Sequence, residues 1–162
     1  MEKGKSARVE DIRKYILEKH SETWPILEAL SPADQEKEVY VKSDVTWTVR
    51  DIVAHLADSE VGLLGQAKRV AVGKPSLPED FDLDRWNRGV VRRTADKSYS
   101  DLLKQILEAH HGELQFLQEM DEEVLDLRGR HGSGVNFSVE DFLRRIPQHR
   151  WEHTQDISEA IG

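Results

Sequence analysis

The chain has 162 residues, a formal net charge of −8, 38% hydrophobic and 33% charged residues, and no cysteine. This length fits one ordinary domain spanning residues 1–162, and the composition is typical of a folded protein that is neither disordered nor embedded in a membrane. The acidic balance argues against nucleic-acid binding, and the lack of cysteine excludes disulfides, thiolate metal ligands and a cysteine nucleophile.

The beginning of the chain carries no apolar segment of the kind that a secretory signal needs. No apolar run approaches the ~18 residues of a membrane span. We therefore expect a cytoplasmic protein with no membrane partner. Any metal ion that it binds must be held by His, Asp or Glu.

Four long segments carry apolar residues at helical spacing and are therefore predicted to be amphipathic helices. Pro25 is expected to kink or divide the first of them. Three have start signals, because a capping residue is followed three positions later by an acid, at Thr48 with Asp51, at Ser98 with Asp101 and at Ser138 with Asp141. The four helices are predicted at about residues 7–30, 48–72, 98–120 and from 138 towards the C-terminus.

Shorter segments connect these helices. Residues 83–93 are predicted to form a short extra helix, residues 38–44 an extended connector, and the glycine-containing stretch 127–136 a flexible loop or an ordinary connector. Little of the sequence has the two-residue alternation of a strand. We therefore predict an all-α fold, a four-helix bundle with a short extra helix.

The last predicted helix carries His149 and His153 one turn apart, so both side chains point to the same side. Phe142, Ile146 and Ile157 lie within roughly 60° of that direction at ~100° per residue, which places the pair in the stripe that should face the core. Two buried imidazoles each need partners for both ring nitrogens. A metal ion can take one nitrogen of each ring, whereas core histidines satisfied by nearby carbonyls or carboxylates are the alternative.

The second predicted helix adds two candidates. His55 falls on the flank of the apolar stripe, beyond Ile52, and would need a neighbouring helix to cover it, whereas Glu60 lies close to the centre of the stripe. Bundle cores build metal sites from side chains on facing helices. His55 opposite His149 and His153 would give three neutral nitrogen ligands and leave the remaining coordination positions open, as catalytic metal sites do.

Three segments of the sequence resemble the DinB and YfiT-like superfamily. They are the tryptophan-to-histidine segment of residues 46–56, the mid-chain segment of residues 81–87, and the neighbourhood from His149 to Asp156. Many members place a Gln three residues after the second histidine, where this chain has Asp156. The resemblance covers roughly residues 8–160 and depends on the ordered combination of segments, because each motif alone is weak.

This resemblance implies an up-down-down-up four-helix bundle that holds a divalent metal ion, commonly nickel, zinc or iron, on three histidines. Carried over to this sequence, the metal ligands are His55, His149 and His153. Family members are often homodimers. They include S-transferases that use low-molecular-weight thiols, a mycothiol-dependent isomerase and proteins described as metal-dependent hydrolases.

The first functional hypothesis is an enzyme whose metal ion lowers the pKa of a bound water or thiol. Because the chain has no cysteine, the thiol would arrive as a small-molecule cosubstrate. Glu60 is the candidate general base or acceptor for a metal ligand, and its alternative role is a buried ion pair with an arginine from another helix. On family grounds alone we favour thiol transfer over hydrolysis. The competing hypotheses are a non-catalytic metal-binding or sensor module and a site whose histidines bind no metal.

Overall fold

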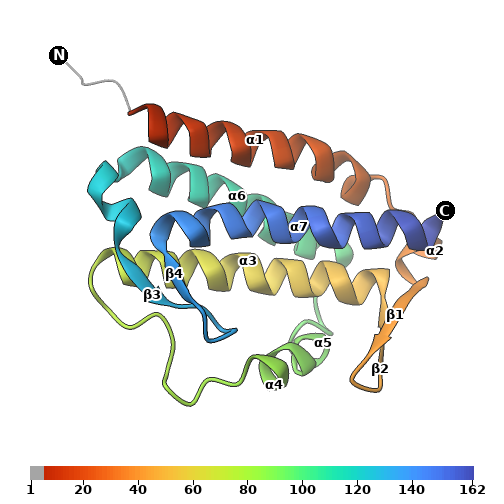
Figure 1. The fold of residues 1–162 in the computed structure, drawn as a ribbon. Helices are drawn as coiled ribbons and strands as arrows, with labels where there is room; N and C mark the ends of the chain where they lie inside the picture. The colour runs from red at the N-terminus through yellow and green to blue at the C-terminus, as the bar shows by residue number, and fades with distance from the viewer. Residues whose placement is uncertain (1–5) are drawn as a thin grey trace.

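The computed structural model describes residues 6–162, in which four long helices pack as a bundle (Figure 1). They are α1 (Ala7–Glu28), α3 (Val49–Ala71), α6 (Tyr99–Glu119) and α7 (Val139–Ile161). Helices α1 and α7 run in one direction and pack against each other, while α3 and α6 run in the opposite direction. The arrangement is therefore up-down-down-up, which confirms the predicted fold.

Short helices occupy the connections. Helix α2 (Pro32–Gln35) follows α1, and the crossover from α3 to α6 contains α4 (Leu83–Arg88) and α5 (Val90–Arg93). The single helix predicted over residues 83–93 is thus divided at Gly89, because glycine weakens the interior of a helix.

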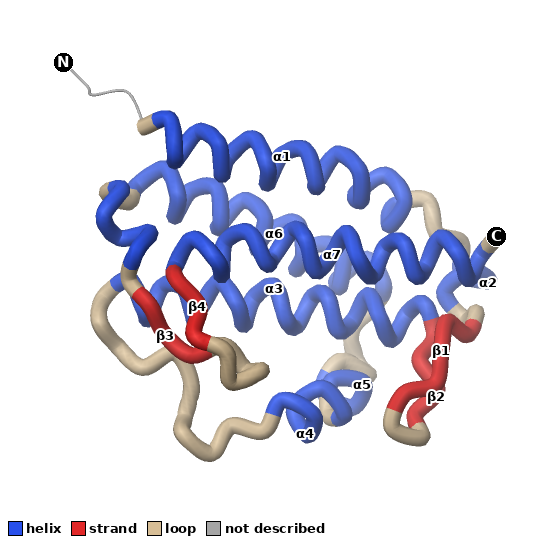
Figure 2. Tube along the Cα trace, viewed as in Figure 1, coloured by secondary structure: helices blue, strands red, loops and turns tan. Residues whose placement is uncertain are grey.

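Two β-hairpins replace segments that were predicted as connectors. Strand β1 (Glu38–Lys42) pairs with β2 (Val45–Thr48), and β3 (Arg128–Arg130) pairs with β4 (Asn136–Ser138), both antiparallel. Each second strand leads directly into a long helix, β2 into α3 and β4 into α7. Figure 2 shows both hairpins and the α4–α5 segment along one side of the bundle. The prediction of an extended connector and a loop was therefore incomplete, because such short strands leave little alternation in the sequence.

Side-chain capping fixes where the long helices begin. Thr48, Ser98 and Ser138 each accept a hydrogen bond from the backbone N–H three residues later, and the acid at that position accepts one from the backbone N–H of the cap. These reciprocal pairs satisfy N–H groups that a helix start would otherwise leave free. The predicted starts at residues 48, 98 and 138 are confirmed. Pro25 lies inside α1, which continues to Glu28, so this proline does not divide the first helix.

The buried residues form two apolar clusters with polar side chains between them. One cluster includes Ile12 and Phe142, and the other includes Ile52 and Ile157. On each long helix, buried or half-buried polar residues separate the parts that belong to the two clusters. We call these residues the buried polar layer: His20 on α1, Glu60 on α3, His110 and Glu113 on α6, and Arg150 on α7. No helix of residues 6–162 is both long and apolar enough to cross a membrane.

The cap of α3 provides a test of the helix start. Thr48→Ala removes the side-chain oxygen that accepts the N–H of Asp51, so we expect the free energy of unfolding to fall by about 1 kcal/mol. Urea unfolding followed by circular dichroism measures the change. Ser100→Ala, at an exposed position in the first turn of α6, is the control and should change stability by less than about 0.5 kcal/mol. Equal effects of the two substitutions would contradict the capping role.

Candidate metal centre

Three histidine side chains from two antiparallel helices meet at one point. The Nε2 atom of His149 on α7 lies 3.3 Å from Nε2 of His55 on α3 and 3.0 Å from Nε2 of His153. One ligand atom from each residue lies within 4.8 Å of the other two. The structure thus brings together the three histidines that the sequence analysis singled out.

The spacing of these nitrogens fits a single metal ion. Nitrogens held at about 2.1 Å from one ion lie roughly 3.0 Å apart at octahedral angles and roughly 3.4 Å apart at tetrahedral angles. The two separations from Nε2 of His149, 3.3 Å and 3.0 Å, fall in this range. Hydrogen bonds among the Nε2 atoms are a poorer account, because a neutral imidazole carries only one N–H. The Nδ1 atoms of all three rings are also buried without a hydrogen-bond partner among residues 6–162.

The three rings are held in the neutral form that binds metals. Burial, together with the nearby charges of His153 and Lys42, lowers the pKa of His55 to about 4. The pKa of His149 is lowered well below its ordinary value by burial and by the other two histidines. For His153, burial also lowers the pKa, although Asp156 opposes the shift. Neutral imidazoles offer a free lone pair, so near pH 7 protons compete little with a cation.

Neighbouring side chains explain how His55 reaches the site from the flank of its helix. The ring of Trp47, at the end of β2, contacts the His55 ring edge-on with centroids 6.0 Å apart. On the other side, α7 brings His149 to a centroid distance of 5.0 Å. The carboxylate of Asp156 lies 3.6 Å from Nδ1 of His153, just beyond hydrogen-bonding distance, and is the nearest candidate acceptor for that ring.

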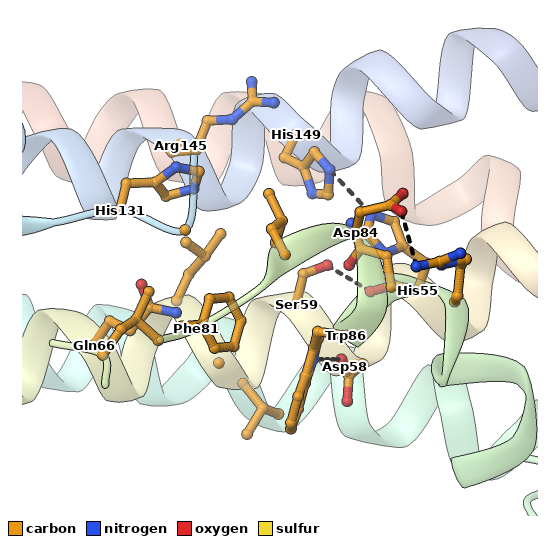
Figure 3. Close-up of a pocket in the computed structure, with 18 of the residues that line it drawn as sticks. His55, Asp58, Ser59, Gln66, Phe81, Asp84, Trp86, His131, Arg145 and His149 are labelled. Carbon is orange, nitrogen blue, oxygen red and sulfur yellow. Dashed lines mark hydrogen bonds and ion pairs between the residues drawn. The ribbon is translucent and has the colours of Figure 1, made fainter. Parts of the chain in front are cut away.

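The histidines line one end of a pocket of about 1010 Å³ between α3 and α7. The aromatic side chains of Phe81 and Trp86 lie on one side of it, and His131 and Arg145 lie on the other (Figure 3). Trp86 is fixed to α3 by a 2.8 Å hydrogen bond from its indole N–H to Asp58. Residues of the two hairpins and the crossover therefore complete a cavity whose base is formed by rigid helices.

Glu60 lies in the core, away from this cavity, and is not among the described residues that line it. Its side chain is fully buried and accepts hydrogen bonds from Arg150, with Nε 3.2 Å from Oε1 and 3.1 Å from Oε2. Burial raises the pKa of Glu60, and the guanidinium of Arg150 opposes the shift. The role of general base stays a prediction, and this geometry corresponds to the alternative, an ion pair with an arginine from another helix.

The other members of the buried polar layer surround this ion pair. A second guanidinium nitrogen of Arg150 lies 2.8 Å from Nδ1 of His20, whose ring stacks on His110 with centroids 3.7 Å apart. Burial and the charge of Glu60 raise the pKa of Glu113 well above its ordinary value, which favours the protonated acid. The sequence analysis did not find this layer. The available signal was a charged residue among the apolar positions of three helices: Glu60 on α3, Glu113 on α6 and Arg150 on α7.

A helical bundle of this topology with a three-histidine cluster between its second and fourth long helices defines a recognisable class of protein. The sequence profile of the DinB superfamily matches residues 16–157. The chain therefore belongs to the DinB superfamily.

Two solved structures share the fold. YfiT from Bacillus subtilis, described as a probable metal-dependent hydrolase with an unusual four-helix bundle topology, superposes with a TM-score of 0.76 at 18% identity, covering 99% of this chain and 90% of YfiT. An uncharacterised protein from Escherichia coli UTI89 superposes with a TM-score of 0.75 at 11% identity, covering 94% and 91% of the two chains. No curated protein sequence matches the chain.

The ion pair between Glu60 and Arg150 makes a strong prediction about stability. Glu60→Leu or Arg150→Met alone leaves a buried charge without its partner and should lower the free energy of unfolding by about 3–5 kcal/mol. The double variant removes both charges and should regain most of that loss, as measured by urea unfolding. As a control, Glu10→Gln disrupts an exposed pair with Arg13 and should have little effect. Additive losses in the double variant would contradict this account.

The stacked histidines of the buried polar layer predict a dependence of stability on pH. Burial lowers the pKa of His20 to about 4 and that of His110 to about 3, whereas both return to about 6.5 on unfolding. As the pH falls below about 6.5, the unfolded chain takes up protons first, so the metal-free protein should lose stability.

This loss can be measured by urea unfolding with a chelator present, at several values between about pH 7 and about pH 5. The variant His110→Gln should lose less stability over this interval than the parent protein, because one titrating group has been removed. The matched variant His111→Gln changes the exposed neighbour and should keep the full dependence. Equal dependence in the two variants would contradict the assignment.

Proposed function

We propose that this protein is a metal-dependent enzyme in which His55, His149 and His153 hold one divalent cation. The observation that supports the proposal is the convergence of three half-buried, neutral histidines at the end of a large pocket. A set of three protein ligands leaves coordination positions for a reactant, which is the form that catalytic metal sites take. Nickel, zinc and iron all suit imidazole ligands, and availability decides among them.

A cation bound there would act as a Lewis acid and lower the pKa of a coordinated water or thiol. The chain itself would position the reactants. The three histidines fix the metal, Asp156 lies where it can orient His153, and the pocket walls exclude bulk water from the reacting groups. Glu60 and Arg150 would act through the packing of α3 against α7, because both are buried in the core.

Thiol S-transfer is the reaction that we favour, with a low-molecular-weight thiol as cosubstrate, since the chain supplies no thiol of its own. Metal-dependent hydrolysis is the second candidate, supported by the likeness of the fold to YfiT. A metal-binding or sensor module without activity would use the same ligands but leave the pocket without a chemical role. The homodimer and the cytoplasmic location that we expect stay predictions, and sedimentation analysis would test the first.

Metal binding tests the basis of the proposal. Untagged protein titrated with zinc or nickel should bind one equivalent. His149→Ala should abolish this binding because only two of the three histidine ligands remain. Isothermal titration calorimetry measures both the stoichiometry and the affinity. His111→Ala removes an exposed histidine on α6 outside the cluster and should bind metal as the parent does. Equal binding by parent and His149→Ala would contradict the assigned site.

Turnover separates the proposed reactions. The metal-loaded protein is assayed with chlorodinitrobenzene across a panel of small thiols, and with a nitrophenyl ester in their absence. Thiol-dependent turnover that is lost in His149→Ala would support S-transfer, and thiol-independent ester cleavage with the same loss would support hydrolysis. One equivalent of metal with no turnover in either assay would favour the binding module.

A further inference from the structure

The pocket extends far beyond the three histidines, along the surface of α3. Residues of this helix line it from His55 to Arg69, a distance of about 21 Å at the rise of an α-helix. A volume of about 1010 Å³ is at the upper end of the range for small-molecule sites, which is roughly 300–1,000 Å³. A small thiol or a water molecule at the histidines would leave most of this space unfilled.

Two glycines of α3 lie at the base of the extended part. Gly62 and Gly65 both line the pocket, and a side-chain carbon added at either would meet no other described atom within 4 Å. Gly62 lies two helical turns beyond His55 on the same face, about 10 Å along the axis, and Gly65 lies about 15 Å along. Open space above both glycines therefore forms a groove that leads away from the histidines.

Apolar side chains form the wall of this groove. Phe81 and Trp86 pack with centroids 5.9 Å apart, and Leu83 lies between them in the sequence and also lines the pocket. Trp86 is held in place by its hydrogen bond to Asp58 and by the guanidinium of Arg93 over its ring. Although it is fixed, Trp86 remains 46% exposed, and Val61 on α3 is 49% exposed. An apolar surface that is held rigid and left open to the pocket favours an apolar ligand.

Three of the four acids that line the pocket are already paired, which argues against a strongly cationic ligand. Asp58 accepts from Trp86, Asp84 pairs with Arg88 at 3.2 Å, and Glu152 pairs with Arg145 at 2.8 Å. Lys42, Lys68 and Arg69 also line the pocket, so its charged groups lie around an apolar groove and are not all paired with each other.

A polar group marks the far end of the groove. The side-chain oxygen of Gln66 is buried and has no hydrogen-bond partner within residues 6–162, and Gln66 lines the same pocket (Figure 3). A buried amide oxygen without a partner is unfavourable, so a donor on a ligand would relieve it.

We propose that the site takes a substrate with a polar, metal-binding head and a long apolar body, an acyl, alkyl or aryl chain that lies over Gly62 and Gly65 against Phe81 and Trp86. This inference rests on the proposed function for the position of the head, and on the groove alone for the body. The protein thereby selects for chain length, because each further methylene buries apolar surface in the groove.

A homologous series of ligands tests the groove. Straight-chain hydroxamates from acetohydroxamate to octanohydroxamate carry one metal-binding head and bodies of increasing length. On the zinc-loaded protein their affinity, measured by calorimetry, should rise about threefold to fourfold per methylene. Affinity that does not change along the series would overturn the proposal.

Two variants fill the groove without touching the histidines. Gly62→Leu and Gly65→Leu place a side chain in open space and exchange glycine for a better helix former, so both should fold. Each variant should bind acetohydroxamate and zinc as the parent does, but its affinity for hydroxamates should no longer increase with chain length. The loss should begin at a shorter chain in Gly62→Leu, which is nearer the histidines. Gln118→Leu, on the exposed face of α6, is the control and should keep the full rise.

A second series makes the test independent of the metal. Straight-chain alcohols from butanol to decanol have no strong metal-binding head, and their binding to metal-free protein is measured by displacement of anilinonaphthalene sulfonate. Affinity that rises with length in the parent and is constant in Gly62→Leu supports the groove even if zinc fails to bind, in which case only the proposed function fails. A rise that is equal in parent and variant would overturn the groove assignment.

Discussion

The buried ion pair between Glu60 and Arg150 joins α3 to α7 and thereby determines where the candidate metal ligands lie. Arg150 directly follows His149, and Glu60 comes five residues after His55, so the same two helices meet at the ion pair in the core and at the histidines beside the pocket. Either charge alone in the core would be costly, which favours the one register in which both are paired. That register also brings the Nε2 atoms within the spacing of one metal ion.

The pocket has a base formed by two long helices and a wall formed by the segments that connect the helices. The histidines stand on two long helices packed in the bundle, and the capped helix starts at Thr48 and Ser138 fix where each helix begins. The two hairpins and the α4–α5 crossover lie outside the bundle and supply most of the pocket wall. This division is common in proteins of one fold with many activities, because connecting segments can change without disturbing the base. In our proposal, the candidate metal centre and the groove beside it accordingly serve different parts of one substrate.

The buried polar layer also shows that the role of a polar residue on the apolar face of a helix depends on the partner that another helix brings to it. Glu60 at the centre of its stripe is compatible with a general base and with an ion pair, and the sequence offers no way to choose. The choice depends on Arg150, which is 90 residues away in the sequence and reaches Glu60 only after the helices pack. The clustering of three histidines, in contrast, could be predicted because His149 and His153 are one turn apart and the resemblance to a family supplied His55.

By itself, the sequence determined the four helices, three of their capped starts, the exclusion of thiolate chemistry and the histidine pair. These features depend on periodicity, on hydrogen bonds between residues three positions apart, or on composition. They can therefore be recognised from short stretches of the sequence. Only the tertiary structure decided that α7 and Trp47 cover His55, that Glu60 pairs with Arg150, and that two short hairpins build the pocket. The physical reason is that the rotation and register of one helix against another are set by side chains from distant segments, whose pairing no local pattern records.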